Sequence, residues 1–140
     1  MRWSFESTDA GEAYTVRFDL LAYLKSRAAL DSDLEAAALI FGELVGNVVR
    51  HAPGPITVEI FWERGNAVLR VVDKGPGFEW SGSVTLPEIM AESGRGLYIA
   101  RSVARALHVR RLAGNGTEAT AWLPVSLKTE SARAARRKAV

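Results

Sequence analysis

The sequence predicts an α/β protein, a two-layer sandwich with helices on one face of a mixed, mostly antiparallel sheet. Two successive stretches in the first half carry apolar residues at helical spacing. Most of the remaining apolar residues alternate with polar ones around short turns that contain glycine. With 140 residues the chain can bury one core, so we expect a single domain over 1–125 and a basic tail over 126–140.

The first elements are a short strand over 2–7 and a helix over 10–29. The strand is predicted by alternating aromatic residues, and the helix by valine and leucine residues on one face. Ser32 and Glu35 have the spacing of a capping box, which predicts the start of a second helix over 34–52. This helix is apolar nearly all round, so we expect it to be largely buried.

A β-hairpin is predicted over 56–73, where the residues of 56–63 alternate and an Arg-Gly-Asn turn leads into 67–73. Side chains alternate between the faces of a strand, so Leu69, Val71 and Asp73 should share the inner face while Arg70 faces water. A carboxylate on the core side of a sheet is costly without a partner. Asp73 is therefore a candidate for a functional role.

The second half continues with a helical turn over 86–91, a helix from Gly94 to about Leu107, and two closing strands. The strands are expected over 108–112 and 117–124, joined by a Gly-Asn-Gly turn. The complete order of elements is then βααββ(α)αββ, which favours paired helices layered on one sheet.

Composition excludes several classes of function. The chain contains no cysteine, so thiol catalysis, disulfides and cysteine-based zinc sites are ruled out. Lysine and arginine number 18 against 16 acidic residues, and the excess lies in the tail, which holds Lys128, Arg133, Arg136, Arg137 and Lys138 against Glu130. This argues against direct nucleic-acid binding by the folded part. No apolar run suits a membrane span or a signal peptide, so we expect a cytoplasmic protein.

The second helix carries an unusual polar row. Glu43, Asn47 and His51 are four residues apart, so they lie on one helix face among apolar neighbours. Such pairs are usually a solvated stripe, but here little polar face remains for solvent to reach. His51 also suits a structural hydrogen bond at the end of the helix.

Three glycine-containing segments follow, and each has an ordinary alternative. Asp73 to Phe78 combines a buried carboxylate with glycines that allow close backbone approach to a ligand, or forms a tight turn. Glu92 to Leu97 opens a helix, where backbone N–H groups favour anions, or is a flexible loop before it. Gly114 to Thr117 has the pattern of a hairpin turn.

In this order, the four segments resemble the motifs of the GHKL nucleotide-binding superfamily, whose members share the Bergerat ATP-binding fold. Residues 43–52 look like its N-box, 73–77 and 94–96 like its two glycine boxes, and Gly116-Thr117 like its late Gly-Thr. The small size and the Asn-Val-Val-Arg-His-Ala run look most like bacterial anti-sigma factor serine/threonine kinases.

The resemblance implies a role for each matching residue. Asn47 would ligate the Mg²⁺ that bridges the ATP phosphates, Asp73 would bind the adenine amino group with support from Thr117, and Glu43 would be the general base. The remaining positions would shape the adenine-side loop (Gly75 and Gly77) or lie at the phosphates (Gly94, Arg95, Gly96 and Leu97). The roles of Arg50 and His51 stay open.

The function implied by this resemblance is an ATP-dependent serine/threonine kinase that acts as an anti-sigma factor and phosphorylates an antagonist protein. A sigma factor would be a second partner, and a homodimer is expected by family likeness alone. Two alternatives stay open: a nucleotide-gated binding module without catalysis, and the detached catalytic domain of a histidine kinase. Glu43 favours a kinase with its own base, because histidine kinase domains usually carry Asn or His at that position.

Overall fold

The computed structural model describes residues 1–74, 92–114 and 116–129, and of residues 92–96 only the backbone. The predicted helical turn over 86–91, the glycines Gly75 and Gly77, and the tail from 130 onward lie outside the described residues. Helices and strands follow one another in the order β1 (Arg2–Glu6), α1 (Ala10–Arg27), α2 (Leu34–His51), β2 (Pro55–Glu63), β3 (Asn66–Asp73), α4 (Glu92–Val103), β4 (Ala106–Arg111) and β5 (Thr117–Ser126). None of the described helices is long and apolar enough to cross a membrane.

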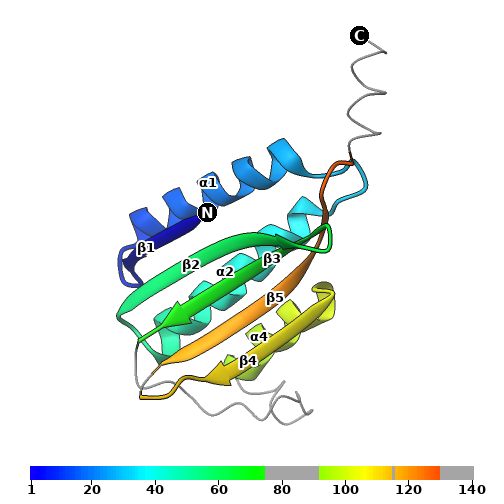
Figure 1. Ribbon diagram of the computed structural model, residues 1–140. Helices are drawn as coiled ribbons and strands as arrows, with labels where there is room; N and C mark the ends of the chain where they lie inside the picture. Colours follow the sequence, from blue (N-terminus) through cyan, green and yellow to red (C-terminus); the bar gives the residue numbers. More distant parts are fainter. Residues whose placement is uncertain (75–91, 115, 130–140) are drawn as a thin grey trace.

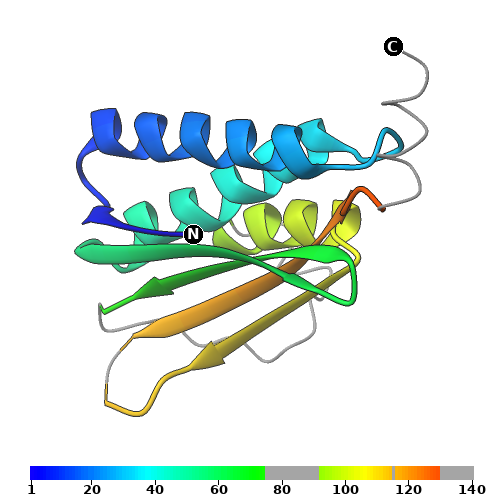
Figure 2. The ribbon, with the colours of Figure 1, turned by 45° about the horizontal axis from the view of Figure 1, so that its top comes forward.

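The five strands form one sheet in the order β1-β2-β3-β5-β4, and the helices cover one of its faces (Figure 1, Figure 2). This confirms the predicted two-layer sandwich. Every strand pairing is antiparallel, whereas the sequence predicts a mixed sheet. The reason is the position of β5: it lies between β3 and β4 and pairs antiparallel with both, so β3 and β4, which run in the same direction, are not neighbours.

The core lies between the sheet and the helical layer. Helix α1 contributes Val16, Leu20 and Leu24, all almost completely buried, and Trp62 of β2 donates a hydrogen bond of 3.0 Å to the hydroxyl of Tyr23 on the same helix. Leu69 and Val71 face this core as predicted. Burying a leucine or valine side chain contributes about 1.5–3 kcal/mol, so this face dominates the stability of the fold.

The start of α2 differs from the prediction. Its N-cap is Asp33, whose Oδ1 accepts a hydrogen bond of 3.0 Å from the backbone N–H of Ala36, so the predicted capping box at Ser32 is wrong. Ser32 instead accepts a hydrogen bond of 3.0 Å from the backbone N–H of Ser126. A serine and an aspartate that are adjacent can both cap a helix, and the contact with the end of β5 decides between them.

The end of α4 also differs from the prediction. The helix stops at Val103 and β4 already begins at Ala106, whereas the sequence predicts a helix to about Leu107 and a strand from His108. No glycine or proline marks the change between the two elements. Strand β5 is longer than predicted and reaches Ser126, and Leu127 then bridges to Ala28.

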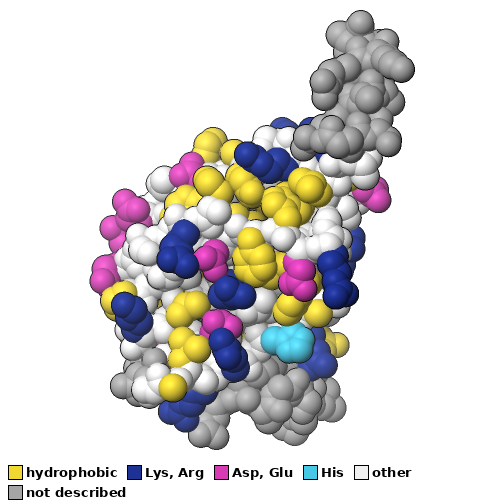
Figure 3. Space-filling model, in the orientation of Figure 1, with side chains coloured by type: hydrophobic (Ala, Val, Ile, Leu, Met, Phe, Trp, Pro, Cys, Tyr) yellow, Lys and Arg dark blue, Asp and Glu magenta, His cyan; other side chains and the backbone are white. Residues whose placement is uncertain are grey.

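The open face of the sheet carries a row of alternating charges that crosses all five strands. Glu59 lies between Arg2, at 2.9 Å, and Arg70, at 3.0 Å, while Glu118 lies 3.0 Å from Arg110 and 4.0 Å from Arg70. Figure 3 looks onto this face and shows blue and magenta side chains side by side across it. Hydrogen bonding from Arg2 holds the pKa of Glu59 below its ordinary value, and the charges of Arg2 and Arg70 act in the same direction, against partial burial.

Candidate functional site

Three polar side chains are buried together on the helix side of the sheet. Asn47 comes from the C-terminal part of α2, Asp73 from the last position of β3 and Thr117 from the first position of β5, and their exposed fractions are 3%, 2% and 4%. All three line one small cavity between α2, α4 and the ends of β3 and β5. The structure therefore brings together three of the residues for which the sequence predicts a nucleotide-binding role.

Two acceptor atoms of this cluster have no partner among the described residues. They are Oδ1 of Asn47 and Oγ1 of Thr117. A buried polar atom without a hydrogen bond costs about 1–3 kcal/mol, and native proteins rarely keep such atoms without a reason. A ligand that supplies the missing partners would recover this free energy, so the cluster has the character of a binding site.

The backbone beside Asp73 is packed tightly against Gly116. A Cβ atom at Gly116 would lie well inside van der Waals contact with the carbonyl oxygen of Asp73, and the glycine has a φ of +114°. No other residue type fits both conditions. The glycine therefore lets the start of β5 approach the end of β3 closely enough for Thr117 to lie beside Asp73.

Glu43 lies one helical turn before Asn47 on α2, and its side chain is half-buried. The helix geometry sets the two Cβ atoms about 6 Å apart. Glu43 does not line the cavity, and neither does His51, which is the last residue of α2 and is half-buried. Arg50 is exposed, and its guanidinium lies over Gly46, one turn earlier.

The predicted phosphate segment forms the first turns of α4. Gly94, Arg95 and Gly96 belong to this helix, which begins at Glu92. Leu97 is 1% exposed and lines the cavity, so it ties the beginning of α4 to the cluster. The free N–H groups of a helix N-terminus favour anions, which agrees with the predicted place of the phosphates.

The walls of the cavity include apolar residues that sequence reasoning does not identify as part of a site. These are Leu44, Val48, Val71, Val109 and Ala119. Two of them could be found from the sequence, because Val71 and Ala119 lie two residues from Asp73 and Thr117 on the same strand faces. Among the described residues the cavity holds about 10 Å³, about the room of one water molecule.

Among the described residues, the site has too few protein oxygens to hold a hard cation such as Mg²⁺ alone, so a bound nucleotide would have to supply the other ligands. No group of three or more His, Cys, Asp or Glu side chains able to hold a metal occurs in the described part of the chain. The amide oxygen of Asn47 is a suitable ligand for Mg²⁺, which prefers oxygen and keeps several waters. The residues thus fit an ion held jointly by one protein oxygen and by the phosphates of a nucleotide.

Comparison with known proteins agrees with this geometry. Residues 5–122 match the family described as the histidine kinase-like ATPase domain. The fold is similar to that of the Acinetobacter baumannii histidine kinase AdeS, with a TM-score of 0.53, 14% identity, and coverage of 92% of this chain and 68% of that chain. No curated protein sequence matches the chain. The matched span includes α2, Asp73 and Thr117, and we conclude that the chain belongs to the histidine kinase-like ATPase domain family, which indicates ATP binding.

Proposed function

We propose that the protein is an ATP-dependent serine/threonine kinase that phosphorylates an antagonist protein and acts as an anti-sigma factor. The observation that carries this proposal is the position of Glu43, a half-buried carboxylate one turn before the buried amide of Asn47. A protein that only binds nucleotide has no need of a carboxylate at this position. A kinase needs a base close to the site that holds the phosphates.

The proposed mechanism assigns a separate task to each part of the site. Asp73 accepts a hydrogen bond from the adenine amino group, and Thr117 supports the same edge of the base. Asn47 would hold Mg²⁺, which neutralises phosphate charge when bound. The backbone N–H groups at the start of α4 bind phosphate oxygens, and Leu97 anchors that helix against the cavity.

The chemical step is transfer of the γ-phosphoryl group to a hydroxyl of the antagonist. The serine or threonine oxygen attacks the γ-phosphorus, its proton passes to the carboxylate of Glu43, and the bond to the β–γ bridging oxygen breaks to release ADP. General base catalysis of this kind typically contributes about 10²–10⁴ in rate. The rest of the acceleration comes from positioning and charge neutralisation.

The test compares two variants on the same helix. Glu43→Gln keeps the shape of the side chain but removes its basicity, so nucleotide affinity should survive while transfer falls by about 10²–10⁴. Asn47→Ala should weaken the binding of Mg²⁺-ATP itself, because the ion loses its protein oxygen. Nucleotide Kd and transfer of labelled phosphate to the antagonist are measured for both, with Glu63→Gln, an exposed carboxylate at the end of β2, as the control.

One outcome would replace this proposal. If neither the wild type nor Glu43→Gln transfers phosphate above background while ATP still controls partner binding, the protein is a nucleotide-gated binding module. A homodimer and a complex with a sigma factor are further parts of the proposal. Light scattering that gives the monomer mass with and without nucleotide would contradict the homodimer.

A further inference from the structure

Helix α1 has two apolar faces, and only one of them belongs to the core. Val16, Leu20 and Leu24 are buried against the sheet. A second set, spaced by four and then three residues, points away from the core: Tyr14 is 70% exposed, Phe18 is 67% exposed and Leu21 is half-buried. A surface helix needs one apolar stripe for folding. The second stripe is therefore available for another protein segment.

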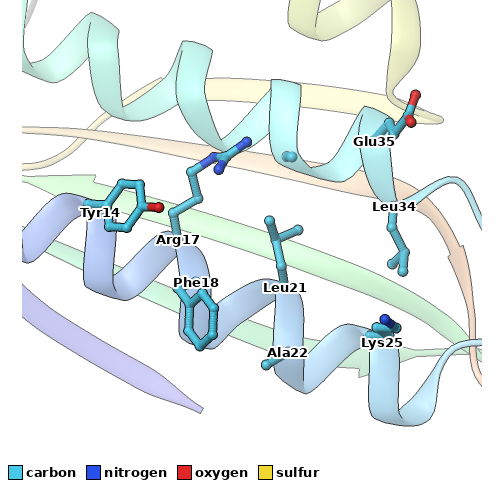
Figure 4. A pocket seen from close by; sticks show the side chains of 9 residues that line it. Tyr14, Arg17, Phe18, Leu21, Ala22, Lys25, Leu34 and Glu35 are labelled. Carbon is cyan, nitrogen blue, oxygen red and sulfur yellow. The ribbon is translucent and has the colours of Figure 1, made fainter.

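This exposed stripe forms one wall of a groove of about 600 Å³ between α1 and the first half of α2. The α2 wall includes Leu34 and Ala38, and Figure 4 shows Leu21 and Leu34 reaching into the space from opposite sides. Along α1 the groove extends from Tyr14 to Lys25, about 16 Å at the rise of an α-helix. This length suits about three turns of a helix lying between α1 and α2.

The charges in the groove indicate the chemistry of its occupant. Arg17 and Lys25 line it, and Figure 4 shows Arg17 extending from α1 toward α2. Neither cation forms an ion pair with any described residue, whereas Arg2, Arg70 and Arg110 on the open sheet face all do. Among the described residues that line the groove, Glu35 is the single carboxylate. The groove therefore presents an excess of positive charge beside an apolar floor.

We propose that this groove binds an amphipathic α-helix of a partner protein, with an apolar stripe flanked by two acidic residues. Arg17 and Lys25 are about 12 Å apart along α1, so the two carboxylates should be about two helical turns apart on the partner. The apolar stripe would cover Phe18 and Leu21, as in other complexes in which a helix fills a groove. The groove lies outside the nucleotide cavity, so the proposal does not depend on phosphoryl transfer.

Two other occupants fit the groove less well. The tail of this chain carries Arg133, Arg136, Arg137 and Lys138, so its charge repels the groove cations. A small apolar molecule would leave much of its surface in water, because the aromatic side chains at one end are about two-thirds exposed. A second copy of the chain is an outcome that the experiment separates from the proposal.

The experiment uses two labelled helical peptides of about 18 residues with leucines at heptad spacing, one with two glutamates two turns apart and one with lysines there. Fluorescence anisotropy with the full chain should show binding of the acidic peptide at micromolar concentration and no binding of the basic one. Arg17→Glu with Lys25→Glu, and separately Phe18→Ser, should each weaken binding at least about tenfold. Arg64→Glu, at the exposed β2–β3 turn, should leave it unchanged.

Three results would overturn the proposal. They are no binding of the acidic peptide, equal binding of both peptides, and acidic-peptide binding that survives Phe18→Ser. Sedimentation that shows a dimer dissociated by Phe18→Ser would assign the groove to a second copy instead. Nucleotide affinity measured on the same variants should equal that of the wild type, so a failure here is distinguishable from a failure of the proposed kinase activity.

Discussion

Polar side chains have different surroundings on the two faces of the sheet. On the open face, Glu59 and Glu118 each have two arginine neighbours, so three arginines and two glutamates alternate across five strands. On the helix side, Asn47 and Thr117 keep buried oxygens without partners in the described structure. In the row, Nε of Arg70 has no hydrogen bond but lies 4.0 Å from a carboxylate oxygen of Glu118. The buried oxygens of Asn47 and Thr117 have neither a hydrogen bond nor an ion pair among the described residues, which marks a place for a ligand.

The largest effect should come from adding a Cβ atom at Gly116, where the start of β5 approaches the backbone of Asp73. Gly116→Ala would force a Cβ atom against the carbonyl oxygen of Asp73 at a φ that alanine avoids. We expect a loss of about 2–5 kcal/mol in the free energy of unfolding, from strain and steric overlap together, with loss of nucleotide binding. Gly114→Ala is the matched control, because it has a φ of +91° but open space around it, and chemical denaturation of both variants isolates the steric part.

The next largest effect should be on nucleotide affinity, through Asp73 on the helix side of the sheet. Asp73→Asn should weaken ATP and ADP binding about ten- to a hundredfold, since a hydrogen bond to a charged acceptor is worth about 1.5–3 kcal/mol. Titration with a fluorescent ATP analogue measures this. Glu118→Gln on the open face should leave the affinity unchanged. Equal affinity of the wild type and Asp73→Asn would remove Asp73 from the adenine site.

A smaller effect should come from removing the buried hydroxyl of Thr117, which should stabilise the protein. Thr117→Val replaces an unpartnered buried hydroxyl by a methyl group of similar size, so the protein without ligand should gain about 1 kcal/mol while its nucleotide affinity falls. The melting temperature should rise by about 2–5 °C. Thr120→Val, three residues later on the opposite face of β5, should not change nucleotide affinity. A Thr117→Val variant that is less stable than the wild type would contradict the interpretation of the hydroxyl.

The smallest effect should come from breaking the charge row. Glu59→Gln should cost no more than about 1 kcal/mol, because its partners are partly exposed, and the cost should shrink with added salt. The pKa of Glu59 is lowered in the folded state, so its contribution is present above its ordinary pKa of about 4.3 and is lost as pH falls through the lower folded value. Unfolding followed from pH 5 to pH 2 should therefore show a smaller acid-induced loss for the variant.

Local signals in the sequence predict most of the fold. The β2–β3 hairpin follows from the alternation in β2 and from Arg64-Gly65, where φ values of 50° and 79° form the tight turn. The errors arise where a distant contact decides. Ser32 forms a hydrogen bond with Ser126, 94 residues away, and the change from α4 to β4 occurs without a glycine or proline that would mark it in the sequence.

The candidate site is predictable in part for the same reason. Asn47 can be identified because apolar residues surround it in the helix, and Asp73 because it shares the inner face of its strand with Leu69 and Val71. The contribution of Val109 and the contact between Gly116 and Asp73 depend on β5 lying between β3 and β4. No local pattern specifies that order of strands, so these residues become visible only in three dimensions.

The order of strands also has a consequence for how the protein is made. The centre of the sheet joins β3 to a strand that the ribosome adds about fifty residues later, and β1 pairs with a strand about equally distant along the chain. Such long-range pairings form slowly, because the entropy of closing the loop is lost before the contacts form. Until β5 emerges, Asp73 has no Thr117 beside it and β3 presents an unpaired edge. Assembly of the nucleotide cavity therefore has to wait until β5 has been synthesised.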